Sequence, residues 1–292
     1  MKDHIKISLR KDFMKKILFV IDGNELSMPA LDFACYLGRL TRSTITGVVL
    51  ESLPGDKEPA LAMTHRLPST NWKRDDPSCA NTRKRNSIDA ILFRFKYACE
   101  NRLVRYRIHC DSGIPAEEIV SESRYADLIV VDAATSFDGG FEGRPTSFVK
   151  DILKDAECPV VIAPESFDGL TEIIFTYDGS KSSAFAIRQF AYLFPELENK
   201  KATLLQVNED GEWTMNEKHR WAEWLQNRYS AISFHALKGD VEDNLVDYLF
   251  ARKNCMVVMG AYGRKGVSRF LKTSHAERII KTMALPVFVS HY

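Results

Sequence analysis

Short, nearly continuous runs of hydrophobic residues recur along the whole chain. In its first half they occupy residues 17–21, 45–50, 128–131 and 160–162. Runs of this length are typical of strands buried on both faces, as a parallel sheet requires. Between the runs, apolar residues return every three or four positions, which predicts amphipathic helices. The stripes with this helical period are Leu31, Ala34, Cys35 and Gly38; Val149, Ile152, Leu153 and Ala156; Ala186, Ile187, Phe190, Ala191 and Phe194; and Ala276, Ile279, Ile280 and Met283.

The pattern of the first half is repeated in the second. Residues 16–23 (KILFVIDG) are echoed by residues 172–179 (EIIFTYDG), 156 positions later. Residues 126–132 are echoed 128 positions later, and residues 158–162 are echoed 127 positions later. The spacing shrinks because the first copy contains an insertion over residues 51–87 that has almost no counterpart in the second. The chain is therefore predicted to contain the same fold twice.

Each copy alternates strands with helices, which predicts two similar doubly wound, mainly parallel five-stranded α/β domains. We expect the first domain over residues 14–165 and the second over residues 170–292. Residues 1–13 form an N-terminal extension without a counterpart in the second copy. Translation starting at Met14 is an alternative explanation of that extension.

The amino-acid composition excludes several classes of protein. Of 292 residues, 45% are apolar and 27% charged, which excludes a disordered or collagen-like chain. The 40 Lys and Arg residues almost balance 39 Asp and Glu residues, so the chain lacks the positive field that non-specific nucleic-acid binding needs. No apolar run is long enough to cross a bilayer and no secretory signal precedes the first strand, so we expect a soluble cytoplasmic protein.

The cysteines and histidines give no metal motif. The six cysteines never form a CxxC pair, and most are expected to be small buried residues in a reducing compartment. The seven histidines show no HxxxH or HExxH spacing, so no metal site is expected. His275 could touch a ligand, but a residue at the start of a helix is the plainer interpretation.

Three features of the second copy converge on the carboxyl ends of its predicted strands, where open α/β sheets bind ligands. Asp178 follows the first strand, so its carboxylate either accepts hydrogen bonds from a ribose or base, or merely caps the next helix. Gly260 and Gly263 follow a buried strand and either let a ligand approach the backbone or form a plain turn. Thr273 and Ser274 open a helix whose N-terminus suits phosphate, although both are also ordinary N-cap residues.

With these residues at this spacing, the chain resembles a tandem universal stress protein, over residues 14–292. The family's nucleotide pattern is Gly-x2-Gly-x9-Gly-(Ser/Thr), with an Asp after the first strand. The second copy has Gly260-x2-Gly263-x9-Thr273-Ser274, with Asp178 in the Asp position. The resemblance implies an adenine nucleotide alpha hydrolase-like fold and a site for ATP or a related adenine nucleotide.

The resemblance also implies a role for each matching residue. Asp178 and Val207 would hold the adenine and the ribose, while the two glycines and Ser274 would surround the triphosphate. Tyr177 and Met259, which flank these positions, would line the same cleft.

One position departs from the family pattern, because Thr273 stands where the ATP-binding members carry glycine. A β-branched residue held at positive φ costs roughly 1–2 kcal/mol, which lowers affinity by up to about thirtyfold. Its Cβ would also crowd a phosphate. We therefore expect the second copy to bind nucleotide weakly, if at all.

The first copy departs further from the pattern. It keeps Asp22, but Asp132 and Thr135 replace the two glycines, and Thr146-Ser147 follow after a longer loop. A carboxylate about 5 Å from a phosphate would repel each unit charge by roughly 3 kcal/mol at an effective dielectric near 20. The first copy is therefore expected to bind no nucleotide and to have a structural or regulatory role.

The function that these observations favour is that of a non-enzymatic stress-response protein. The resemblance implies that the last strands, over residues 160–163 and 287–290, pair across the two domains as a pseudo-dimer, with a homodimer left open. No general base or metal-binding carboxylate accompanies the glycine loop, so slow nucleotide hydrolysis is a minor hypothesis, at most a weak ATPase. A scaffold that binds an unknown protein partner is the other alternative.

Two aromatic stretches have both a plain and a bolder interpretation. Residues 66–107 combine many basic residues with Trp72, Phe93, Phe95 and Tyr97. The bolder interpretation is a nucleic-acid or acidic-partner patch, and the favoured one is a solvated loop before an amphipathic helix whose aromatics lie in the core. Trp221, Trp224 and Leu225 share one helical face, for which core packing is expected and a partner surface is the alternative.

Overall fold

A computed structural model describes residues 15–23, 25–51, 82–137, 142–261, 280 and 284–290. The first copy contains strands and helices in the order β1 (Lys16–Ile21), α1 (Met28–Leu40), β2 (Thr44–Glu51), α2 (Thr82–Asn101), β3 (Arg105–Ser112), α3 (Pro115–Ser123), β4 (Leu128–Val131), α4 (Ser147–Asp155) and β5 (Val160–Ile162). The second contains β6 (Glu172–Thr176), α5 (Lys181–Leu193), a 3-10 turn η1 (Pro195–Leu197), β7 (Lys201–Asn208), α6 (Met215–Gln226), β8 (Ala231–Lys238), α7 (Val241–Phe250), β9 (Cys255–Gly260) and β10 (Val287–Ser290).

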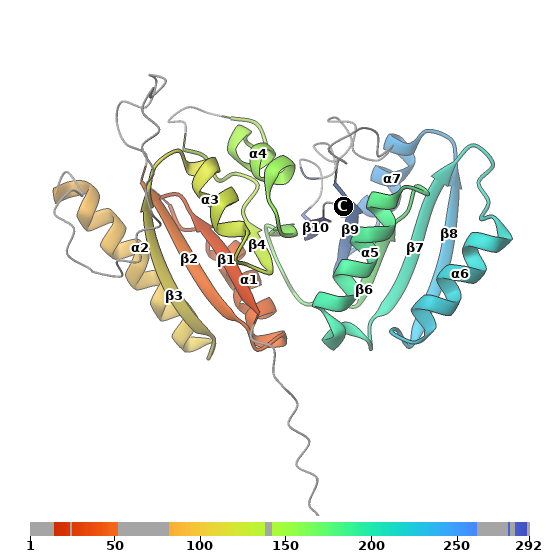
Figure 1. Ribbon diagram of the computed structural model, residues 1–292, viewed down its shortest axis with the longest axis horizontal. Coiled ribbons are helices and arrows are strands. Elements are labelled where there is room, and N and C mark those ends of the chain that lie inside the picture. The colour runs from red at the N-terminus through yellow and green to blue at the C-terminus, as the bar shows by residue number, and fades with distance from the viewer. Residues whose placement is uncertain are drawn as a thin grey trace, which may run out of the picture.

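All ten strands form one sheet in the order β3-β2-β1-β4-β5-β10-β9-β6-β7-β8. The two halves lie side by side with β5 and β10 between them (Figure 1). Among the described residues, every strand pair inside a copy is parallel, and only β5 and β10 pair antiparallel, with Phe288 opposite Val161. The fold class predicted from the repeat is confirmed, and so is the pairing of the last strands that the family resemblance implies.

The core forms two layers, one on each face of the sheet. Alternate strand residues contribute to the two layers, because successive side chains of a strand point to opposite faces. One layer packs β1 residues such as Phe19 against α1, α2 and α5. The other packs residues such as Val20 against α3, α4 and α7. The helix stripe expected over residues 276–283 lies mostly outside the described residues, although Ile280 is helical and buried.

Side chains tie the two copies together along the first of these layers. Phe288 on β10 lies opposite Val161 on β5 of the first copy, and its ring packs at 5.2 Å from Phe190 and 6.3 Å from Phe194 of its own copy, measured between centroids. Lys15, just before β1, donates a hydrogen bond to the carbonyl of Leu193 in the second copy. Phe167, in the connection between the copies, packs edge-on against Phe33 of α1 at 4.9 Å. The apolar core is therefore continuous from one copy to the other.

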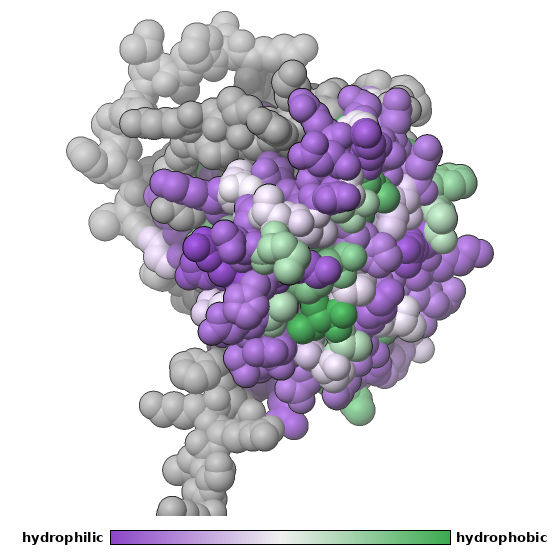
Figure 2. All heavy atoms as spheres, turned by 90° about the vertical axis from the view of Figure 1, so that its right-hand side faces the viewer, coloured by the Kyte–Doolittle hydropathy of each residue, from purple (hydrophilic) through white to green (hydrophobic). Residues whose placement is uncertain are grey.

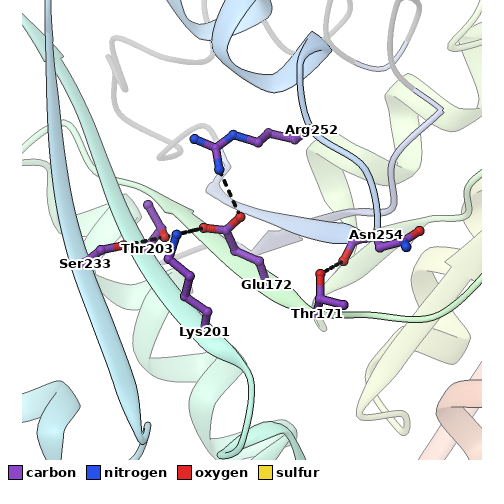
Figure 3. Close-up of polar contacts among 7 residues, drawn as sticks. All are labelled: Thr171, Glu172, Lys201, Thr203, Ser233, Arg252 and Asn254. Carbon is purple, nitrogen blue, oxygen red and sulfur yellow. Dashed lines mark hydrogen bonds and ion pairs between the residues drawn. The ribbon is translucent and has the colours of Figure 1, made fainter.

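The first strands of the two copies begin with opposite charges. In the second copy Glu172 is 9% exposed, and its carboxylate accepts from Thr203 at 2.5 Å and pairs with Lys201 at 3.0 Å and Arg252 at 3.2 Å (Figure 3). Burial raises the pKa of Glu172, but the hydrogen bonds from Thr203 and Lys201 outweigh it and leave that pKa below its usual value. In the first copy Lys16 holds the matching position.

Lys16 pairs with a carboxylate on the helix that covers it. Its Nζ lies 2.9 Å from Glu122 Oε2 on α3, and His109 Nδ1 lies 3.5 Å from the same oxygen. The hydrogen bonds from His109 and Lys16, against the opposing effect of burial, lower the pKa of Glu122 to about 2. The first strand thus carries the cation in the first copy and the carboxylate in the second, where the cations lie on β7 and on the segment after α7.

The outer strand of the second copy is partly covered by side chains. The face that includes β8 and α6 has a hydrophobic band in its middle, within a hydrophilic surround (Figure 2). Along β8, residues 232–237 are each only partly exposed. Trp213 Nε1 donates to the carbonyl of His235 at 3.0 Å, and Lys218 lies over the ring of Phe234. These contacts hinder the addition of another strand at this edge.

Replacing Phe288 by alanine should lower the free energy of unfolding by about 3–5 kcal/mol, because the substitution leaves a cavity where the two cores meet. Chemical denaturation of the full chain measures this loss. The matched control is Phe250→Ala, whose ring is exposed and should cost less than about 0.5 kcal/mol. Equal losses for the two variants would contradict the shared core.

Replacing Glu122 by glutamine should destabilise the protein near neutral pH by about 1–3 kcal/mol. In the folded state the pKa of the Glu122 carboxyl lies below its ordinary value of 4.5. The stability that ionised Glu122 contributes is therefore fully present above about pH 4.5. The contribution is lost as the pH falls from about 4.5 towards 2. Thermal unfolding of both proteins at a series of pH values should show the difference shrinking on acidification, and a constant difference would refute this assignment.

Candidate functional site

Asp178 lies at the carboxyl end of β6 and shapes the start of the next helix. Its Oδ1 accepts hydrogen bonds from the backbone N–H of Ser180 at 2.9 Å and from the hydroxyl of Ser183 at 2.7 Å. Ser180 is the N-cap of α5, and its hydroxyl accepts from the Ser183 N–H at 3.1 Å. Asp178 is therefore not the cap itself. It holds the capping residue and the first turn of α5 in place.

Gly260 ends β9, the strand next to β6, and faces the same helix turn. A Cβ on this residue would lie 2.5 Å from the carbonyl carbon of Ser182 and 2.5 Å from the nitrogen of Ser183. The hydroxyl of Ser182 also donates to the carbonyl of Ala261 at 2.5 Å. Glycine is thus required here because α5 packs directly on the end of β9. Sequence reasoning offered ligand approach or a turn for this residue and missed this packing.

Three other predicted site residues are buried, and they belong to different layers. Val207 and Met259 pack in the layer that α7 covers. Tyr177 packs in the opposite layer, with its ring stacked on Trp213 at 5.6 Å and its hydroxyl donating to Glu217 at 3.1 Å. Strand alternation thus places Tyr177 and Met259 in opposite layers, and their lining of one cleft stays a prediction.

The phosphate half of the predicted site cannot be placed in the same way. Gly263, Thr273 and Ser274 lie outside the described residues. His275 lies outside them as well. The structure therefore brings together Asp178 and Gly260 at the first turn of α5, with Val207 and Met259 buried nearby in one layer.

In the first copy the position of Gly260 is taken by Asp132, at the end of β4. Its Oδ2 accepts from the hydroxyl of Ser27, the N-cap of α1, at 2.5 Å. Its Oδ1 accepts from the backbone N–H of Ala134 at 2.8 Å. Asp22, the counterpart of Asp178, accepts from the backbone N–H of Glu25 at 2.7 Å. A carboxylate of the chain itself therefore lies where the second copy has no side chain.

A second carboxylate lies at the first turn of α4. Glu142 Oε2 accepts from the backbone N–H of Ser147 at 2.7 Å and from its hydroxyl at 2.9 Å. Glu142 Oε1 accepts from the hydroxyl of Ser136 at 2.6 Å. The hydrogen bonds from Ser136 and Ser147 lower the pKa of Glu142, so the group is an anion at neutral pH. In the first copy the donors at this helix start thus already bind a carboxylate.

The aromatic residues of the basic stretch divide between core and surface. Phe95 on α2 is fully buried, as expected. Phe93 and Tyr97 are 67% and 60% exposed, so the expectation that they lie in the core is wrong. The helical period would have separated them, because Phe93 and Tyr97 are four residues apart and lie on a different face from Phe95. Trp72 lies outside the described residues.

The second aromatic stretch packs largely as expected. Leu225 is fully buried, while Trp221 and Trp224 pack partly buried against the same core layer. The guanidinium of Arg228 lies 3.8 Å from the ring centre of Trp224.

No helix in the described part of the chain is long and apolar enough to cross a membrane. Among those same residues, no cluster of three His, Cys, Asp or Glu side chains is arranged to hold a metal ion.

Comparison with known proteins identifies similar chains over both copies. The model of the universal stress protein family matches residues 14–164 and 170–291. A curated relative, universal stress protein Slr1230 of Synechocystis sp. (strain ATCC 27184 / PCC 6803 / Kazusa), is 24% identical over 153 residues. That match covers 50% of this chain and 51% of the relative, so the chain spans about half the length of the curated relative that it matches.

Solved structures extend the similarity to nearly the full chain. A universal stress protein from Archaeoglobus fulgidus DSM 4304 has a TM-score of 0.66 at 17% identity, covering 94% of this chain and 98% of that one. A functionally unknown protein from Pseudomonas aeruginosa PAO1 has a TM-score of 0.58 at 15% identity, covering 96% and 93%. At these identities the likeness concerns the fold alone.

Replacing Gly260 by alanine should lower the free energy of unfolding by roughly 1–3 kcal/mol, because the new Cβ forces α5 away from β9. Gly143→Ala is the matched control, since a Cβ there meets nothing within 4 Å. Denaturant titration followed by tryptophan fluorescence compares the two variants with the wild type. Wild-type stability of Gly260→Ala would contradict the close approach of helix and strand.

Proposed function

The chain belongs to the universal stress protein family, and from that premise we propose that it is a stress-response protein whose second domain holds ATP or a related adenine nucleotide. The observation that carries the proposal is the meeting of Asp178 and Gly260 at the start of α5. These residues follow β6 and β9, which are neighbours in the sheet. Gly263, Thr273 and Ser274 complete the family spacing in the sequence.

In the proposed complex each part of the nucleotide has its own residues. Asp178 and Val207 hold the adenine and ribose, beside Met259. Gly260, Gly263 and Ser274 surround the phosphates, because glycines and the N-terminus of a helix expose backbone N–H groups to an anion. Thr273, in the place of the family's glycine, weakens this hold. The nucleotide is bound without being turned over.

The first domain, over residues 14–165, is proposed to bind no nucleotide. Asp132 and Glu142 already accept the hydrogen bonds of Ser27 and Ser147. A phosphate placed there would lose these donors and would also face two negative charges. One nucleotide per chain is therefore expected, in the domain over residues 170–292.

A scaffold that binds a protein partner is the second candidate. It is favoured by the exposed, stacked rings of Phe93 and Tyr97, whose centroids lie 6.2 Å apart on the surface of α2. Neighbouring exposed apolar side chains are a feature of protein-binding surfaces. The two candidates differ in what titration with nucleotide should detect.

Replacing Thr273 by glycine should tighten the binding of ATP, by up to about thirtyfold, because a residue without Cβ tolerates positive φ and leaves room for a phosphate. Isothermal titration of the purified full chain with ATP and magnesium measures both affinity and stoichiometry. The wild type should bind one nucleotide weakly, and Thr273→Gly one nucleotide more tightly.

The matched control for this experiment is Thr146→Gly, the same substitution at the corresponding position of the first copy. It should leave the affinity and the stoichiometry unchanged. If neither the wild type nor Thr273→Gly releases heat at a protein concentration of about 100 μM, which detects even a dissociation constant near that value, nucleotide binding is refuted and the scaffold is favoured.

A further inference from the structure

Two cysteines in the first copy lie close together under the surface. Cys35 is on α1 and Cys99 is near the end of α2, and their Sγ atoms are 4.0 Å apart. Both side chains are buried. Of the other cysteines that the structure describes, Cys158 and Cys255 are buried elsewhere and Cys110 is exposed on β3. The neighbouring thiols belong to helices that touch each other on one face of the sheet.

An ion pair between the same two helices lies beside the thiols. Arg102, three residues after Cys99, donates to Asp32, three residues before Cys35, at 2.5 Å. Its guanidinium also donates to the carbonyl of Ala98 at 3.2 Å. The Arg102 and Asp32 side chains are 33% and 46% exposed, and ion pairs that are this accessible are weak. This ion pair is therefore a weak restraint on the end of α2 that covers the sulfur atoms.

The two sulfur atoms differ in acidity. The hydrogen bond from Cys99 lowers the pKa of Cys35, and the positive charge of Arg102 acts in the same direction against burial. The same hydrogen bond and burial raise the pKa of Cys99. Of the two thiols, Cys35 is therefore the one that loses its proton more readily. Two buried thiols with sulfur atoms 4.0 Å apart are the arrangement of a redox-sensitive pair.

We propose that Cys35 and Cys99 form a reversible disulfide between α1 and α2 when the protein meets a peroxide. The Cys35 thiolate attacks one peroxide oxygen, the O–O bond breaks, and the departing hydroxide takes up a proton to become water. Cys35 is now a sulfenic acid. The Cys99 sulfur then attacks the Cys35 sulfur, loses its proton, and displaces a second water as the S–S bond forms. The two thiols lose two electrons and two protons, and the peroxide is reduced to two waters.

The sulfur atoms must approach by about 2 Å to bond, since a disulfide is close to 2.05 Å long. The cross-link would join residues that are 64 positions apart. The loop that it closes contains β2 and the whole of residues 52–81. Closing a loop of this length restricts the unfolded chain, so the oxidised form should unfold at a higher temperature than the reduced form.

Peptide mapping of the full chain tests the proposal. The wild type is treated with hydrogen peroxide, its remaining thiols are blocked with N-ethylmaleimide, and the digest is examined by mass spectrometry. A linked peptide that contains Cys35 and Cys99 is expected, and dithiothreitol should abolish it. Oxidation confined to Cys110, or linked peptides that join other cysteines, would overturn the proposal.

A Cys99→Ser variant tests the order of the steps. Its Cys35 should accumulate as the sulfenic acid, which dimedone captures as a stable adduct. If this variant carries no adduct at Cys35 while the wild type forms the linked peptide, the attacking sulfur has been assigned wrongly.

An Asp32→Asn variant tests the access route, because it releases Arg102 without removing the guanidinium. It should form the linked peptide about two- to fivefold faster than the wild type, as expected for the loss of an exposed ion pair. The matched control is Asp89→Asn, an exposed aspartate on α2, which should react at the wild-type rate. Equal rates for the two variants would refute the role of the ion pair.

Discussion

The antiparallel pairing of β5 with β10 is the contact on which the arrangement of both copies depends. Every other strand pair is parallel and internal to one copy. Parallel strands must be covered on both faces and paired at their sides, and this single contact covers one edge of each copy. Phe288 extends the contact into the core, where it packs on Phe190 and Phe194. The chain thus builds by duplication the interface that separate subunits would otherwise have to supply.

The fold could be predicted from the sequence far more completely than the site. Buried parallel strands require nearly continuous apolar runs. The run over residues 17–21 and its echo in the second copy therefore predict strands of a parallel sheet from the sequence alone. The requirement for glycine at position 260 could not be predicted in this way. A Cβ is excluded there because Ser182, in the first turn of α5, packs against the end of β9. The hydrogen bond from Ser27 to Asp132 likewise joins residues 105 positions apart. No local pattern in the sequence shows that these two residues meet in the folded protein.

The two copies differ in how the end of a strand contacts the start of a helix. At the end of β9 the absence of a side chain lets α5 pack against the strand. At the end of β4 the Asp132 carboxylate accepts from Ser27, the cap of α1, and Glu142 accepts from Ser147, the first residue of α4. A carboxylate at a helix N-terminus makes the same kind of interaction as a phosphate would. In the first copy, the chain itself supplies an anion at these helix starts.

The reversed charges at the first strands also bear on how the two halves have stayed distinct. Lys16 faces Glu122, whereas Glu172 faces Arg252. If recombination between the repeats replaced β1 by β6, Glu172 would meet Glu122. The reciprocal exchange would place Lys16 beside Arg252. Each hybrid would then leave half-buried like charges together, which costs several kcal/mol. The reversed charges therefore make the first strands of the two copies non-interchangeable.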